Sequence, residues 1–288
     1  MRFVAFEMNG VAGLALADAR GGLRGLLSSA PGYPGDLDTL IRGAPGAIDS
    51  AAAALKAAPA IDPKGLRYLP PFRRADKIIC IGLNYVDHNI ESGHQPVTYP
   101  GVFARFNSSL IGHGAPIVLP KVSKQLDYEG ELVAVVGRGG WRIPRERALE
   151  HVAGYSVFND ASLRDYQMKS ASRQWTMGKN FDGTGAFGPA FVTADELPPG
   201  ALGLHLETRL NGEVMQSAST ADMMVSVAAL IELLSEAITL SPGDVIVTGT
   251  PSGVAMFRKP PTWMKDGDVC EIEVEGVGLL RNSIVAEK

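Results

Sequence analysis

The sequence is poor in cysteine, with only Cys80 and Cys270 among its 288 residues. Disulfide-stabilised proteins use cysteine far more densely, so we expect two buried thiols in an intracellular protein. Runs of lysine and arginine are also missing, and the net charge is −4. Proteins that bind nucleic acid usually carry a basic stripe, so nucleic acid is not an expected partner.

Long apolar runs are missing as well. No stretch approaches the roughly 20 apolar residues of a membrane span, and no signal peptide precedes the first expected strand. We therefore expect a cytoplasmic protein without a membrane partner. What the chain does have is 45% hydrophobic residues, 33 glycines and 19 prolines, which indicates a large core built mainly from strands and turns.

The first part of the chain has the pattern of a small domain, residues 1–72. Apolar residues alternate on both sides of Asn9-Gly10, a dipeptide typical of hairpin turns. Short helices are predicted at 36–41 and 49–58 from their Asp and Ser start signals. The proline-rich, charged stretch 69–74 indicates a linker, so we place a second domain at 73–288.

The second domain is predicted to be rich in strands, with few helices. A second hairpin is expected at Asn211-Gly212, and an amphipathic helix over 223–238. Together these features predict an α+β protein with a β-rich core and helices at its edge. The expected strands include residues 77–82, 117–119, 126–137, 155–160, 244–249, 269–274 and 279–285.

Two carboxylates, Glu129 and Glu131, stand at the beginning of an apolar run that predicts a buried strand. Side chains two apart on a strand point to the same face. Two adjacent carboxylates at the edge of a core repel each other unless one takes up a proton or both share a cation. The run therefore indicates a site for a hard divalent metal. The alternative is a solvated strand face.

His88 and Glu91 are three residues apart in a stretch that predicts one or two helical turns. At this spacing the two side chains share one helix face, and a glutamate beside an imidazole orients the ring. The pair suits a general base that holds a water molecule. An exposed surface pair is the alternative from these residues alone.

Further candidates follow the strand that ends in Asp160. A capped helix or turn over 162–168 puts Arg164 and Gln167 on one face, where Arg164 either forms a salt bridge with Asp160 or clamps substrate. Residues 183–188 match G-x-G-x-x-G, but no strand leads into them and no helix follows. They are therefore interpreted as a glycine-rich loop and not as a dinucleotide site. The turn after residue 249 exposes the hydroxyl of Thr250.

Five stretches, taken together and in this order, resemble the fumarylacetoacetate hydrolase superfamily. The resemblance covers residues 77–288, and the long segment 257–268 is most similar to the domain-containing protein 2-like subgroup of that family. The stretches are residues 82–88, 127–132, 159–167, 175–182 and 249–254.

The resemblance implies a mixed, rolled β-sandwich with peripheral helices and one Mg²⁺ at its mouth, with Mn²⁺ or Ca²⁺ as alternatives, and it suggests a homodimer. Where family members commonly have lysine, this chain has Arg105, whose planar fork binds differently from an ammonium group. The implied metal ligands are Glu129, Glu131 and Asp160; the implied catalytic residues are His88, Glu91 and Lys179; and the implied substrate contacts are Arg105, Arg164, Gln167 and Thr250.

These residues predict a metal-dependent hydrolase that cleaves a carbon–carbon bond in a 2,4-dioxo acid, such as an acylpyruvate. The dyad favours this reaction, because it can direct water at the distal carbonyl. Without a well-placed water, the same site would tautomerise or decarboxylate oxaloacetate-like acids, or isomerise 2-oxo acids from aromatic catabolism. A non-catalytic binding protein of the same fold is a further alternative. Loops at about 89–106 and 255–265 are expected to select the substrate's tail.

Overall fold

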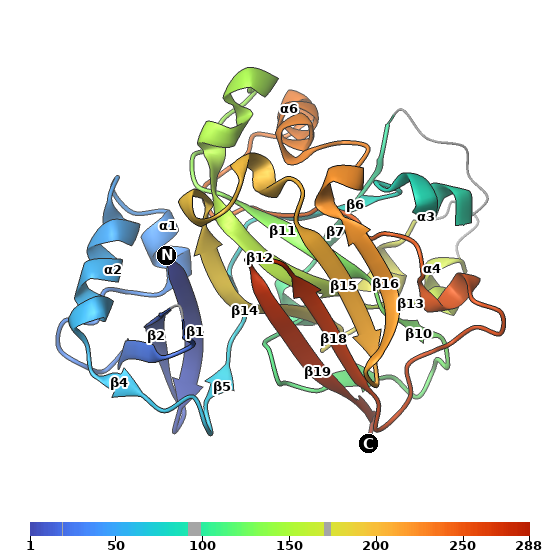
Figure 1. Cartoon of the computed structure of the whole chain (residues 1–288), viewed down its shortest axis with the longest axis horizontal. Coiled ribbons are helices and arrows are strands. Elements are labelled where there is room, and N and C mark those ends of the chain that lie inside the picture. The colour runs from blue at the N-terminus through green and yellow to red at the C-terminus, as the bar shows by residue number, and fades with distance from the viewer. Residues whose placement is uncertain (19, 92–98, 170–173) are drawn as a thin grey trace.

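The computed structural model describes residues 1–18, 20–91, 99–169 and 174–288. Figure 1 shows a smaller N-terminal part beside a larger, strand-rich part. Residues 92–98, which belong to the first of the two expected tail-selecting loops, lie outside the described residues. Within the described part, no helix is both long and apolar enough to cross a membrane.

The N-terminal part begins with the expected hairpin. Strands β1 (Arg2–Met8) and β2 (Val11–Ala17) pair antiparallel around Asn9 and Gly10. Both turn residues have positive φ, 53° and 77°, as a hairpin turn of this kind requires. The same part contains β3 (Leu23–Leu27), α1 (Leu37–Ile41), α2 (Ala47–Ala57), β4 (Ala60–Ile61) and β5 (Arg67–Tyr68).

One large sheet joins the two parts of the molecule. Strand β1 pairs antiparallel with β14 (Gly185–Thr193), so the N-terminal hairpin extends the sheet of the larger part. The division at residue 72 stays a prediction. Beyond β14 the strand order is β12 (Val152–Asp160), β11 (Gly130–Val136), β17 (Val245–Val247), β6 (Ile78–Gly82) and β7 (Gly101–Arg105), while β8 (Leu110–Ile111) pairs with β14.

A second sheet packs against the first, as the sandwich prediction requires. Its strands are β16 (Glu213–Ser219), β15 (His205–Leu210), β18 (Val269–Val274), β19 (Gly278–Ala286) and β9 (Ile117–Leu119). The hairpin at Asn211-Gly212 forms as expected, and β18 and β19 pair antiparallel on either side of Gly276. Smaller elements are the β10 (Leu126–Asp127) and β13 (Ser162–Leu163) pair, helices α3 (Val86–Glu91), α4 (Arg164–Gln167), α5 (Thr176–Lys179) and α6 (Val227–Ala237), and 3-10 turns at 107–109, 145–151, 194–196, 199–201, 220–222 and 255–257.

Strand β11 shows why the core forms here. Every residue in it is buried, and its side chains alternate between two clusters. Leu132 and Ala134 belong to the cluster that contains the second sheet, while Val133 and Val135 belong to the cluster that reaches Phe3 and the helices of the N-terminal part. A strand covered on both faces has the continuous apolar sequence seen here. Cys80 and Cys270 are buried free thiols, as expected.

One local expectation was wrong. Residues 183–188 were expected to form a loop, but from Gly185 onward they belong to β14, a central strand. The expected linker, residues 69–74, connects β5 to β6 without helix or strand, and its Phe72 is completely buried and packs edge-on against Phe191, with ring centroids 5.3 Å apart. In residues 185–188 tertiary packing overrides the local glycine signal.

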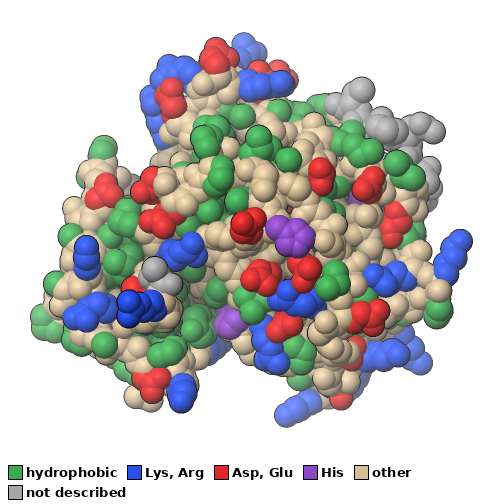
Figure 2. Space-filling view, viewed as in Figure 1, with side chains coloured by type: hydrophobic (Ala, Val, Ile, Leu, Met, Phe, Trp, Pro, Cys, Tyr) green, Lys and Arg blue, Asp and Glu red, His purple; other side chains and the backbone are tan. Residues whose placement is uncertain are grey.

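The surface agrees with the mixed charge of the sequence. On the face shown in Figure 2, basic and acidic side chains lie intermixed with hydrophobic ones. The second sheet carries an ion-pair network, in which Arg209 contacts Glu207 at 2.5 Å and Glu273 at 2.9 Å. Such half-exposed pairs add little to stability individually.

Candidate active site

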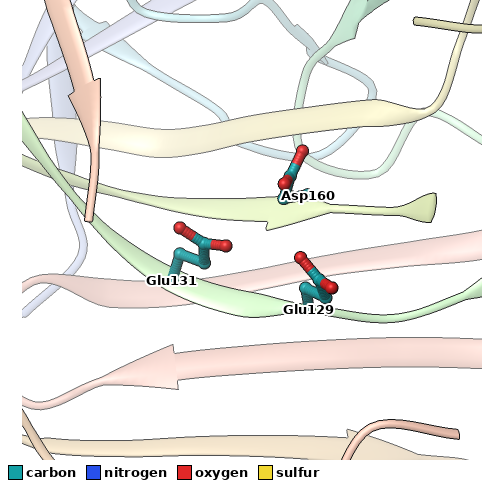
Figure 3. A group of neighbouring side chains, drawn as sticks. All are labelled: Glu129, Glu131 and Asp160. Atoms are coloured by element: carbon teal, nitrogen blue, oxygen red, sulfur yellow. The ribbon is translucent and has the colours of Figure 1, made fainter. Parts of the chain in front are cut away.

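Pairing of β11 with β12 brings three carboxylates together. Glu129 directly precedes β11, Glu131 is the second residue of β11, and Asp160 is the last residue of β12. The backbone N–H of Asp160 donates to the Glu129 carbonyl at 2.9 Å. One carboxylate oxygen from each of the three lies within 4.8 Å of the others. Figure 3 shows the three side chains directed into one space. All three are at most 5% exposed.

Three buried cationic side chains surround this group. Lys179 Nζ lies 2.6 Å from Glu129 Oε2 and 2.5 Å from Asp160 Oδ2. Arg164 reaches the other Glu129 oxygen at 2.7 Å, and Arg105 reaches the other Asp160 oxygen at 2.6 Å. Each cation is at most 5% exposed. Buried charges persist only when they are paired, so these contacts keep the site ordered.

The two glutamates have opposite pKa shifts. Burial raises the pKa of Glu129, but the charges of Lys179 and Arg164 outweigh it and lower that pKa to about 2. Burial raises the pKa of Glu131 well above its ordinary value, and the neighbouring Asp160 and Glu129 carboxylates add to the rise. Without a further cation, Glu131 is therefore the carboxyl group that tends to hold a proton.

The residues fit a divalent cation. Among the described residues, Glu131 forms no ion pair, and its recorded hydrogen bond is the one from the Gly249 N–H at 2.5 Å. A cation shared by Glu131, Glu129 and Asp160 would supply the missing charge. Carboxylate oxygens are the ligands that Mg²⁺ and Mn²⁺ prefer. The three side chains thus form a candidate metal site.

The His88–Glu91 pair lies on the short helix α3. His88 Nδ1 is 3.5 Å from Glu91 Oε2, close enough for an ion pair but long for a hydrogen bond. Glu91 is held by the backbone N–H of Gly253 at 2.9 Å. His88 is buried, and its ring lies 6.1 Å from that of Phe257.

A cavity of about 360 Å³ connects these groups. Its lining includes seven of the ten site residues expected from sequence, and the other lining side chains are apolar. The seven are His88, Glu129, Glu131, Arg164, Gln167, Lys179 and Thr250.

Three of the expected site residues do not line the cavity. Asp160 and Glu91 lie behind it, in contact with residues that do. Arg105, expected to contact substrate, instead bridges Asp160 and the hydroxyl of Thr184, the latter at 2.7 Å. Its buried guanidinium therefore faces a candidate metal ligand.

Two expected substrate contacts already have protein partners. The Thr250 hydroxyl donates to the Gly130 carbonyl at 3.0 Å and accepts from Gln216 at 2.8 Å. Gln167 Oε1 accepts from Arg164 at 2.7 Å. Both hydrogen bonds of the Thr250 hydroxyl are therefore made within the protein. The bond from Arg164 to Gln167 Oε1 fixes the orientation of the Gln167 amide group and so the direction of its nitrogen.

Sequence reasoning missed Asp127 as a site residue. This carboxylate is completely buried and accepts from Arg164 Nε at 2.8 Å and from the backbone N–H of Ala255 at 2.7 Å. It therefore fixes both the arginine and the segment that carries Met256. Its position two residues before Glu129, between Leu126 and Tyr128, was a usable signal.

The family model "Fumarylacetoacetate (FAA) hydrolase C-terminal" matches residues 77–285. The human protein "Oxaloacetate tautomerase FAHD2A, mitochondrial" is 38% identical over 289 residues, covering 99% of this chain and 92% of its own.

Two solved structures are also similar. A fumarylacetoacetate hydrolase from the psychrophile Exiguobacterium antarcticum has a TM-score of 0.85 and 35% identity, with full coverage of both chains. A fumarylpyruvate hydrolase from Pseudomonas aeruginosa, in complex with Mn²⁺ and pyruvate, has a TM-score of 0.68 and 30% identity over 77% of this chain and 92% of its own.

Proposed function

The chain belongs to the fumarylacetoacetate hydrolase family, and we propose from that premise that it is a divalent-metal-dependent tautomerase of 2-oxo acids of the oxaloacetate type. The observation that carries the proposal is the buried triad of Glu129, Glu131 and Asp160 beside Lys179 and His88. The sequence alone favoured hydrolysis. The name of the human relative supports tautomerisation instead, so hydrolysis becomes the second candidate.

The chemistry requires a proton to move between the carbon next to the 2-oxo group and the oxygen of the enol. A divalent ion held by Glu129, Glu131 and Asp160 would act as a Lewis acid toward enolate charge. His88 is the group that takes and returns the proton, because it lines the cavity and Glu91 orients its ring. Lys179 supplies positive charge next to the developing oxyanion.

The remaining residues bind and orient the acid. Gln167 presents its amide nitrogen to the substrate carboxylate, since its oxygen is held by Arg164. Arg164 itself is fixed by Asp127 and contributes charge without needing to move. Three cations facing four buried carboxylates leave the site short of positive charge. A divalent ion reverses this and favours an anionic substrate.

Hydrolysis of an acylpyruvate-like acid is the second candidate. The observation in its favour is the position of Glu91, which is fixed by Gly253 and lies 3.5 Å from His88. In that arrangement the imidazole could hold and deprotonate a water molecule. Water attack on the distal carbonyl would then break the carbon–carbon bond.

One assay separates the two reactions. The purified protein, supplied with Mg²⁺ or Mn²⁺, is given freshly dissolved oxaloacetate and, separately, acetylpyruvate, and loss of the enol is followed by ultraviolet absorbance. Tautomerisation accelerates enol decay of oxaloacetate without releasing a product acid, whereas hydrolysis consumes acetylpyruvate and yields pyruvate and acetate. No acceleration with oxaloacetate, together with pyruvate release from acetylpyruvate, would reject the first proposal.

Three further expectations stay predictions. The resident metal is expected to be Mg²⁺, with Mn²⁺ or Ca²⁺ also suited to oxygen ligands. A homodimer is expected from the family. A cytoplasmic location was expected from the sequence, whereas the name of the human relative places that protein in the mitochondrion.

A further inference from the structure

One loop holds a carboxylate from the candidate metal site and another from the His88 pair. The loop runs from Gly249 to Gly253, after β17, and the backbone N–H groups at its two ends donate to Glu131 Oε2 at 2.5 Å and to Glu91 Oε2 at 2.9 Å. Glu131 is a candidate metal ligand, and Glu91 orients the imidazole. The position of the 249–253 loop therefore sets how the metal ligands lie relative to His88.

The side chain of Gln216 joins this loop to the strand that carries the metal ligands. Gln216 lies on β16 and is 1% exposed. Its amide nitrogen donates to the Thr250 hydroxyl and to the Pro251 carbonyl, both at 2.8 Å. Its amide oxygen accepts from the backbone N–H of Gly130, the residue between the two glutamates, at 3.0 Å. One amide group therefore connects two backbone segments that are far apart in the sequence.

An amide is the group that these backbone partners require. It accepts from an N–H group and donates to a carbonyl, and a buried backbone group that loses its partner destabilises the folded state. By donating to the Thr250 hydroxyl, Gln216 also directs the hydroxyl proton to the Gly130 carbonyl, which lies 3.0 Å away. The loop and the strand are thus bonded both to Gln216 and to each other.

Close packing around Gln216 leaves little room for adjustment. A Cβ atom at Gly130 would overlap Thr208 Oγ1, and one at Gly253 would overlap the carbonyl oxygen of Met215, the neighbour of Gln216. Both glycines therefore let the second sheet approach the backbone of the site. Gln216 is not among the described residues that line the cavity, so it acts through the groups that it holds.

We propose that Gln216 is a positioning residue, which sets the geometry of the candidate metal site and its alignment with His88. The alignment part rests on the proposed function, because alignment matters only where His88 moves a proton, whereas the metal part does not. Residues that orient metal ligands typically change metal affinity by roughly 10–100-fold when they are replaced. Since Gln216 acts through the backbone, the expected effect is about tenfold.

The test compares metal binding and turnover in Gln216→Met, which removes the amide but keeps a side chain of similar length. Mn²⁺ is titrated into metal-free protein, and the free ion is measured by electron paramagnetic resonance. The dissociation constant should rise about tenfold. With oxaloacetate and saturating Mn²⁺, kcat should also fall about tenfold, while KM changes by less than about threefold because the residues proposed to bind the acid keep their contacts.

Asn282→Leu is the matched control. Asn282 is a buried amide of the same sheet, 2% exposed, whose nitrogen donates to the carbonyls of Gly112 and Ala115 at 2.9 and 2.7 Å. It is not among the described residues that line the cavity. Its loss should lower the melting temperature but leave the Mn²⁺ affinity and kcat at the wild-type values, when every protein is measured well below its melting temperature.

Gln216→Glu tests the same role with little change of shape. The carboxylate still accepts from the Gly130 N–H and adds negative charge, so the Mn²⁺ affinity should not fall. It cannot donate to the Pro251 carbonyl, so kcat should fall about fivefold, the kinetic equivalent of one hydrogen bond.

Two results would overturn the proposal. One is an unchanged Mn²⁺ dissociation constant in Gln216→Met, and the other is an equal rise in Asn282→Leu, which would show that the loss of any buried amide weakens the site. If Gln216→Met does not fold, an unchanged kcat in Gln216→Glu overturns the proposal instead. A wild-type protein that binds Mn²⁺ but does not accelerate oxaloacetate enol decay refutes the tautomerase proposal alone, and the Mn²⁺ comparison still decides the role of Gln216.

Discussion

Replacing Lys179 with methionine should destabilise the metal-free protein and at the same time strengthen its response to Mg²⁺. Lys179 is 2% exposed and bridges Glu129 and Asp160 at 2.6 and 2.5 Å. Methionine fills similar space but leaves both carboxylates without this partner. Breaking a buried ion pair by removing one member costs about 3–5 kcal/mol. We therefore expect the melting temperature in EDTA to fall by roughly 10 °C.

The Mg²⁺ response follows from competition for the same oxygens. In wild type a divalent cation must share Glu129 and Asp160 with the lysine ammonium, whereas in Lys179→Met it competes only with Arg164 and Arg105 for these carboxylates. Binding to the folded state alone stabilises by about 2.7 kcal/mol at a ligand concentration 100 times Kd. Saturating Mg²⁺ should consequently raise the melting temperature of the variant by more than that of wild type.

Lys77→Met provides the matched control for this experiment. Lys77 also pairs with a buried carboxylate, Asp244, at 2.9 Å, but Asp244 is not part of the triad. That variant should lose stability and recover no more with Mg²⁺ than wild type does. The measurement is differential scanning fluorimetry of all three proteins in EDTA and in a Mg²⁺ series. An equal or smaller Mg²⁺ shift for Lys179→Met than for wild type would refute the competition argument.

Three further outcomes are expected. His88→Ala should lower enol turnover by about 10² or more, the usual scale for a lost general base, while calorimetry shows unchanged Mg²⁺ binding. His205→Ala, at an exposed position, is the control. Near-normal turnover in His88→Ala would reject the base assignment. EDTA should abolish activity and excess Mg²⁺ or Mn²⁺ should restore it; full activity in EDTA would remove the metal from the mechanism. Phe191→Ala removes a ring packed on Phe3 and Phe72. The variant should lower the free energy of unfolding, measured in urea, by about 3–5 kcal/mol. A decrease below about 1 kcal/mol would show that the N-terminal part contributes little to the shared core.

Local sequence signals predicted the hairpins well but missed β14. Asn9-Gly10 and Asn211-Gly212 specify their turns through backbone conformations that few other residue pairs adopt. In β14, by contrast, glycine is required by neighbours distant in sequence. A Cβ at Gly185 would lie 3.2 Å from Phe158 and 3.3 Å from Arg105. The same glycines that make this segment resemble a loop therefore allow it to pack as a central strand.

In the site, too, the features set by nearby residues could be predicted from the sequence, and the contacts set by strand pairing could not. The spacing of Glu129 and Glu131 was enough to place two carboxylates side by side. The partner of Arg164 was not predictable in this way: Asp160 was considered, but the arginine pairs with Asp127 because β10 pairs with β13. Likewise, the position of Arg105 behind Asp160 depends on how β7 lies in the sheet. The family resemblance contributed Lys179 and the order of the motifs, which strand patterns alone could not supply.

The contacts of Lys179 with Glu129 and Asp160 have a consequence for a cell in which magnesium is scarce. Because Lys179 already pairs with two of the three carboxylates, emptying the pocket of its ion leaves the surrounding strands held in place. The protein should then survive depletion as an intact, idle enzyme and regain activity as soon as magnesium returns, with no need for renewed synthesis.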